Sequence, residues 1–263
     1  MTAEHDLLHG SGAAGGEVTF SMEARTVSAY SEDALARIEA ALSAHRDAER
    51  AEGMSAYMRC KFPFLGIPTG ERRAMHRAAL AGLPRPTEAE LTDLSRALYA
   101  LPEREYQYVA VDHLIRHVAV CGAGFLATAR QLITTKSWWD TVDGLAARVV
   151  GPLVLAYPEL GAEMDHWIAA EDTWVARTAI LHQLTYKART DDARLFRYCE
   201  RRAADREFFI RKAIGWALRE YSKTDRAAVQ EFIARNDGRL SGLSKREGML
   251  WITGRKPRPG RAR

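Results

Sequence analysis

Hydrophobic side chains recur every three or four positions over most of the chain, which is the period of an amphipathic helix. In the segment DALARIEAALSAHRD, for example, Leu35, Ile38 and Leu42 would share one helix face. Proline, threonine and glycine interrupt the pattern near 67–70 and 84–87, where we expect helices to end. We find no segment of useful length with the period of two that is typical of a β-strand. The pattern therefore predicts an all-α protein.

A weak internal repeat runs through the same predicted helices. Four of them are predicted to begin with an aromatic residue, and these aromatics are 32, 36 and 34 residues apart, at Tyr106, Trp138, Trp174 and Phe208. The spacing suits units of two short antiparallel helices, which stack into a curved solenoid. One helix of each pair would then line the concave surface. Coincidence among amphipathic helices is the alternative interpretation.

One position in this repeat is unusual. Five residues after the aromatic, three units carry an apolar side chain (Val111, Ala179 and Ala213), whereas the second unit carries Asp143. A carboxylate in such a slot destabilises the fold unless it is paired or has a function. A buried salt bridge with Arg177 is the structural interpretation. The functional interpretation is an acid at the centre of a basic concave groove.

Tryptophans surround this position in the sequence. Trp138 and Trp139 are adjacent, so they cannot both face the core from one helix. Trp139 and Asp143 are four residues apart and would share a helix face. An aromatic surface beside a carboxylate suits a cationic ligand, and Trp216 is a third candidate for this surface. Each tryptophan taken alone is more often a core residue.

Charge is distributed unevenly along the chain. The net charge is +4, but residues 172–263 hold 22 Lys and Arg against 11 Asp and Glu, whereas residues 1–171 hold 16 against 23. This basic C-terminal part favours a polyanionic partner such as nucleic acid, although solvated arginine-rich helix faces would give the same count. We expect one repeat domain at 31–253, between disordered tails at 1–30 and 254–263, of which the second is basic.

Several classes of protein are excluded by what the sequence lacks. No apolar run approaches the roughly 18 residues of a membrane span, and the N-terminus has no basic region followed by an apolar one, as a secretion signal would. The three cysteines are too far apart for a zinc site, and the histidines form no HExxH motif. We therefore expect a protein of the reducing cytoplasm, without disulfides and with no metal, no cofactor and no membrane contact.

Five segments of the chain resemble the DNA alkylation repair glycosylases of the AlkD-like, HEAT-like repeat family. The segments are YMRCKFPFLGI, REYQYVAVDHL, TTKSWWDTVD, WVARTAILHQLTYK and EFFIRKAIGWALREYSKT, and they cover roughly residues 54–250 in order. The resemblance implies a solenoid of HEAT-like or ARM-type helix pairs that cradles double-stranded DNA. It also implies hydrolysis of the N-glycosidic bond of N3- and N7-alkylated purines, which leaves an abasic site.

The resemblance assigns roles residue by residue. It implies a catalytic site made of Asp143, of Trp139 beside it and of Trp216 across the cleft. The expected DNA-binding residues are Arg177, Arg211, Tyr57 and Lys187. We expect a monomer that is associated with the nucleoid through its DNA substrate.

The chemistry implied by the resemblance needs few residues. Alkylation at N3 or N7 makes the purine a cation, so it leaves without a strong general acid. Asp143 would stabilise the oxocarbenium-like transition state or activate the attacking water. No lysine is evidently placed as a Schiff-base nucleophile, which favours a monofunctional enzyme. The alternatives are a non-catalytic HEAT-like DNA-binding scaffold and a solenoid that binds an acidic protein.

Overall fold

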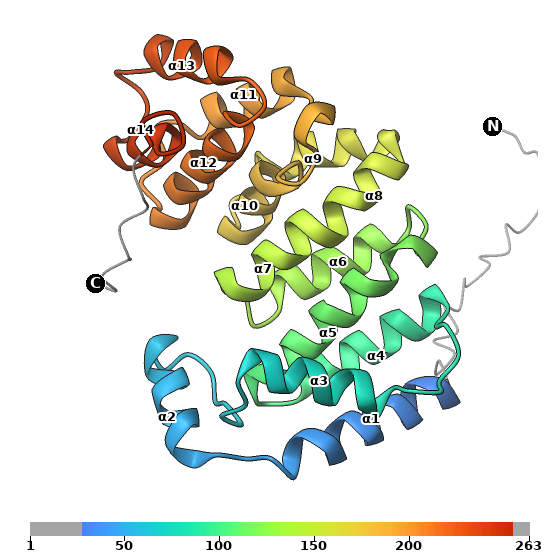
Figure 1. Cartoon of the computed structure of the whole chain (residues 1–263). Coiled ribbons are helices and arrows are strands. Elements are labelled where there is room, and N and C mark those ends of the chain that lie inside the picture. The colour runs from blue at the N-terminus through green and yellow to red at the C-terminus, as the bar shows by residue number, and fades with distance from the viewer. Residues whose placement is uncertain (1–27, 255–263) are drawn as a thin grey trace, which may run out of the picture.

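The computed structural model describes residues 28–254, and every regular element in this range is a helix (Figure 1). The α-helices are α1 (Ala29–Ser43), α2 (Ala48–Tyr57), α3 (Thr69–Ala79), α4 (Glu88–Ala100), α5 (Arg104–His117), α6 (Phe125–Thr134), α7 (Trp139–Leu145), α8 (Gly151–Ala156), α9 (Gly161–Trp167), α10 (Thr173–Leu181), α11 (Asp192–Arg201), α12 (Phe208–Tyr221), α13 (Arg226–Arg235) and α14 (Gly242–Met249). The prediction of an all-α fold is confirmed.

The two predicted tails lie almost wholly outside the described residues. The N-terminal boundary at residue 31 is placed slightly late, because α1 already begins at Ala29. The reason is a helix cap: the hydroxyl of Ser28 accepts a hydrogen bond from the backbone N–H of Ser31. At the other end, Gly254 belongs to the turn that follows α14.

The helices form two layers that follow the chain. Helices α3, α5, α7, α10, α12 and α14 pack side by side in that order, and we call them the inner layer. Helices α4, α6, α9, α11 and α13 each pack on a member of the inner layer and form the outer layer (Figure 1). Each repeat therefore contributes one helix to the inner layer and one to the outer layer, as expected for HEAT-like helical repeats.

The aromatic repeat holds in three units and shifts by one residue in the fourth. Tyr106 and Trp138 are buried and Trp174 is partly buried, but Phe208 is exposed. Because α12 begins at Phe208, that side chain lies on the first turn and faces outward, and Phe209 packs inward instead. The predicted periodicity is thus correct, although its last member is Phe209.

The candidate site stands on an irregular helix. α7 continues through a π-helical turn, Ala146–Val150, directly into α8, which has Pro152 in its first turn. Proline has no backbone N–H to donate, and a π-turn is one way for a helix to absorb that loss. At Gly151 a Cβ atom would lie 2.3 Å from the carbonyl oxygen of His182, so only glycine fits this close approach. We call α7, the part of this helix before the π-helical turn, the α7 arm; it carries Trp139 and Asp143.

Candidate active site and nucleic-acid interface

Asp143 lies in a nearly closed slot on α7, and its charge is paired. Nε of Arg177, on α10, donates to Oδ1 of Asp143 at 2.7 Å, and Nη2 donates to Oδ2 at 2.8 Å. The side chains are 14% exposed for Asp143 and 5% for Arg177. The third nitrogen, Nη1, donates to the backbone carbonyl of Phe209 at 2.5 Å. The buried salt bridge considered from the sequence therefore exists.

This pairing sets the electrostatics of the carboxylate. Burial raises the pKa of Asp143, while the charge and the hydrogen bonds of Arg177 oppose that rise. Each carboxylate oxygen already accepts one hydrogen bond from the guanidinium, and this pairing favours the ionised form against the effect of burial. The geometry suits a fixed negative charge better than a proton acceptor.

The two adjacent tryptophans diverge as predicted. Trp138 is buried, with its ring centroid 5.6 Å from that of Trp174 and 4.9 Å from that of Phe209. Trp139 is only partly buried, and its ring meets that of Tyr57 edge-on at 6.5 Å. Tyr57 is 68% exposed at the end of α2, so the fold brings this residue to α7 across more than eighty positions.

A strained turn after α2 adds a cation that sequence analysis missed. Arg59 and Cys60 both have positive φ angles, 58° and 54°, which are unusual for residues with a side chain. The turn places Nζ of the exposed Lys61 over the ring of Trp138, 4.7 Å from its centroid. A lysine beside a tryptophan 77 positions away leaves no signal in the sequence, because only the fold brings the two together.

Trp216, the tryptophan expected across the cleft, comes from a different inner-layer helix than Trp139 and Asp143. Trp216 lies on α12, partly buried and packed against the main core. It is seven residues after Phe209, two helical turns, and so shares a face of α12 with that residue. Among the described residues no ring contact joins Trp216 to Trp139. Of the three predicted catalytic-site residues, Trp139 and Asp143 thus come from α7 and Trp216 from α12.

Arg211 and Arg177 share a repeat position but not a role in packing. Arg177 contacts Asp143, whereas the guanidinium of Arg211 donates to the backbone carbonyl of Arg206 before α12. The expectation that both arginines lie near Asp143 therefore holds for Arg177. The guanidinium of Arg177 faces Asp143 and not the surface, because its side chain is only 5% exposed. Arg211 is less buried and remains the better candidate for a phosphate contact.

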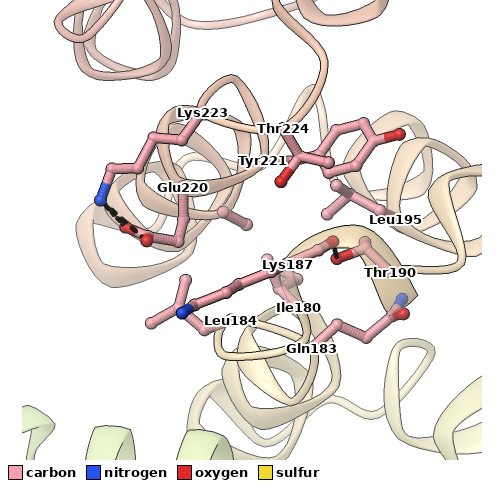
Figure 2. Close-up of a pocket in the computed structure, with 11 residues that line it drawn as sticks. Ile180, Gln183, Leu184, Lys187, Thr190, Leu195, Glu220, Tyr221, Lys223 and Thr224 are labelled. Carbon is pink, nitrogen blue, oxygen red and sulfur yellow. Dashed lines mark hydrogen bonds and ion pairs between the residues drawn. The ribbon is translucent and has the colours of Figure 1, made fainter.

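Lys187 lies at the mouth of a cavity of about 170 Å³ between α10, α11 and α12 (Figure 2). Its backbone has a positive φ of 55°, and its side chain is exposed. Across the mouth, Nζ of Lys223 binds the carboxylate of Glu220 at 2.6 Å and 2.8 Å. Neither Asp143 nor Trp139 lines this cavity. Of the predicted site residues, only Lys187 is among the residues that line this cavity.

Charged side chains bridge each consecutive pair of inner-layer helices. Besides the pair of Asp143 with Arg177 between α7 and α10, three others do so: Arg72 with Asp112 between α3 and α5, Arg104 with Asp140 between α5 and α7, and Lys212 with Glu247 between α12 and α14. Between α10 and α12 the bridge is the bond from Arg177 to Phe209. A buried ion pair alone does not distinguish Asp143. Its distinction is the partly exposed Trp139 on the same arm, which meets the exposed ring of Tyr57 from α2.

A histidine cluster in the N-terminal repeats was overlooked in the sequence. His113 and His117 are four residues apart on α5 with ring centroids 4.7 Å apart, and His76 of α3 lies 5.4 Å from His113. Burial lowers the pKa of His76 to about 4 and that of His113 to about 3. Among the described residues, no group of His, Cys, Asp or Glu has the arrangement of a metal site. These histidines are neutral packing residues.

Comparisons with known proteins agree with this architecture. The sequence profile of the family described as DNA alkylation repair enzyme matches residues 38–252. A solved structure, the predicted DNA alkylation repair enzyme from Enterococcus faecalis, has a TM-score of 0.73 and 33% sequence identity. The match covers 79% of this chain and 97% of that one. No curated protein matches the chain.

The family match covers both layers and the arm that carries Asp143. Within residues 28–254, no helix has the length and apolarity needed to cross a membrane. The profile match, the sequence identity to the solved structure and the shared helical-repeat fold show that this chain belongs to the DNA alkylation repair enzyme family.

Proposed function

We propose that the protein is a monofunctional DNA glycosylase that hydrolyses the N-glycosidic bond of cationic N3- and N7-alkylated purines in duplex DNA. The observation that supports this best is the paired but partly accessible carboxylate of Asp143 on the same arm as Trp139. Membership of a DNA alkylation repair family supplies the class of substrate.

In the proposed reaction, the bond between C1′ and the purine nitrogen breaks and both its electrons go to the base. The base gains these electrons, loses its positive charge and leaves neutral. The sugar becomes oxocarbenium-like, water adds to C1′, and one water proton passes to solvent. Because Arg177 occupies one position on each oxygen of Asp143, we assign the carboxylate to electrostatic stabilisation of the sugar cation rather than to proton abstraction.

We propose that duplex DNA lies along the inner layer, in contact with exposed aromatic and basic side chains. Tyr57 and Trp139 would pack on the sugar beside Asp143, and Lys61, Arg211 and Lys187 would contact phosphates. Arg177 would act through Asp143, because its guanidinium is turned toward that carboxylate. Trp216 would line the same surface from α12.

The decisive experiment is release of 7-methylguanine from methylated duplex DNA by wild type and by Asp143→Asn. We expect the variant to lose about a hundredfold in single-turnover rate, typical of losing one transition-state electrostatic contact, while duplex affinity changes little. Asp112→Asn is the matched control, since it neutralises another inner-layer aspartate that is paired with arginine. Equal rates for wild type and Asp143→Asn would refute the assignment.

A non-catalytic DNA-binding scaffold is the second candidate, and one observation favours it. Both oxygens of Asp143 are hydrogen-bonded within the protein, as they would be in a purely structural pair. In that case wild type would bind duplex DNA and release no base from any alkylated substrate. The same assay therefore separates the two candidates.

A further inference from the structure

The first turn of α7 is held in place from outside the helix. Its N-cap residue, Trp138, makes no side-chain cap, and the residue Lys136 two positions earlier has a positive φ of 47°. The helix has 7 residues before the π-helical turn begins. A helix N-terminus without a side-chain cap leaves its first backbone N–H groups without partners and frays easily. The orientation of Trp139 and Asp143 must therefore depend on contacts with neighbouring helices.

Those contacts come from α5 and converge on Asp140. Arg104, which is fully buried, donates from Nη2 to Oδ1 of Asp140 at 2.5 Å and from Nε to Oδ2 at 3.0 Å. The same guanidinium donates to the carbonyl of Lys136 at 2.8 Å and to the hydroxyl of Thr141 at 3.0 Å. One arginine thus binds residues on both sides of the helix start.

A tyrosine completes this arrangement. The hydroxyl of Tyr108, one turn after Arg104 on α5, donates to Oδ2 of Asp140 at 2.5 Å. Arg104 lies over the ring of Phe62 at 3.9 Å, so the cluster also reaches the segment that follows the strained turn at Arg59 and Cys60. Hydrogen bonds of a carboxylate to ionised or strongly polar donors are among the stronger ones in proteins. They fix Asp140 in one position.

We propose that Tyr108 and Asp140, held by Arg104, are positioning residues for the candidate site: they fix the first turn of α7 and with it the direction of Trp139 and Asp143. The inference rests on the proposed function for its effect on rate. Neither residue is placed to touch the reacting atoms. α7 is thereby held on one side by Arg104 from α5 and on the other by Arg177 from α10.

The test uses Tyr108→Phe, which removes one hydroxyl and keeps the ring. The matched control is Tyr198→Phe, because the hydroxyl of Tyr198 also donates to an aspartate, Asp165, at 2.8 Å, but in the outer layer. We expect Tyr108→Phe to lower the single-turnover rate of 7-methylguanine release by about tenfold, short of the hundredfold that a 1 Å misplacement can cost. Its affinity for the same duplex should change less than about twofold, since it contacts no phosphate.

A second measurement does not depend on catalysis. Amide hydrogen exchange of residues 135–145 should quicken in Tyr108→Phe and stay as in wild type in Tyr198→Phe. Unchanged exchange in Tyr108→Phe, or an equal loss of rate in both variants, would overturn the proposal. If wild type itself releases no base, the proposed function fails, and the exchange of residues 135–145 alone decides whether Tyr108 positions α7.

Discussion

Each layer of the solenoid contains an ion pair between two of its helices, and the two pairs differ in burial. In the outer layer, Arg197 and Asp165 form an ion pair whose side chains are 55% and 43% exposed. In the inner layer, Arg104 and Asp140 are 0% and 5% exposed. Exposed ion pairs add little to the free energy of unfolding, because water screens them. Buried ion pairs hold each charge in one position, at a cost in desolvation. The pair of Arg104 and Asp140 therefore fixes its charges in place within the inner layer, whereas the pair of Arg197 and Asp165 does not.

The largest expected effect tests that difference directly. Asp140→Ala leaves the guanidinium of Arg104 buried without its partner, so we expect the free energy of unfolding to fall by about 3–5 kcal/mol. Asp165→Ala in the outer layer should cost no more than about 1 kcal/mol. Urea unfolding of both variants measures the two values. Similar losses would show that burial does not separate the layers.

Acid should weaken the inner layer through its histidines. The pKa of His76 is lowered to about 4 in the folded protein, so the unfolded chain takes up a proton near its ordinary pKa of about 6.5 while the folded one does not. The stability that His76 contributes is thus present above pH 6.5 and lost as the pH falls from there toward 4, by up to about 3 kcal/mol. The paired carboxylate of Asp112, whose pKa is lowered, responds only at lower pH.

Thermal unfolding across this pH range checks the histidine prediction. His76→Gln should flatten the loss of stability between pH 6.5 and 4, since glutamine does not titrate. His166→Gln is the control, because His166 has a side chain that is 79% exposed on α9. If the wild-type melting temperature does not change over this range, the histidine cluster is not the cause of acid sensitivity.

The charge of the substrate should decide which bases are released. If Asp143 only assists departure of a purine that is already cationic, 7-methylguanine and 3-methyladenine should be released, and uracil and hypoxanthine hardly at all. The reason is that one carboxylate bound by Arg177 offers no proton to a neutral leaving base. Time courses on oligonucleotides with each lesion measure this. Efficient excision of uracil would reveal a general acid that the proposed site lacks.

The smallest expected effect concerns DNA affinity and again compares the layers. Arg211→Ala on α12 should reduce the slope of log affinity against log salt concentration by about one, because one phosphate contact is lost. Arg197→Ala on the outer-layer helix α11 should leave the slope unchanged. Salt titrations of duplex binding give both slopes. Equal slopes for the two variants would mean that the inner layer is not the surface that contacts phosphate.

Much of the fold could be predicted from the sequence, because helices depend on local features. The apolar period placed the helices, and Ser28 marks the start of α1 through its own hydroxyl. The repeat also singled out Asp143, since a carboxylate in an apolar slot is visible without a structure. The separation of Trp138 from Trp139 followed from the helical turn alone.

The composition of the site was decided by tertiary structure. Arg177 and Arg211 occupy equivalent repeat positions, yet one binds Asp143 and the other a nearby carbonyl, which depends on the packing of α10 and α12. Lys61 and Tyr108 reach α7 from helices or turns more than thirty positions away. Sequence spacing fixes which residues share a helix face, but only the stacking of helices decides which faces meet, because those contacts join residues whose separation along the chain carries no pattern.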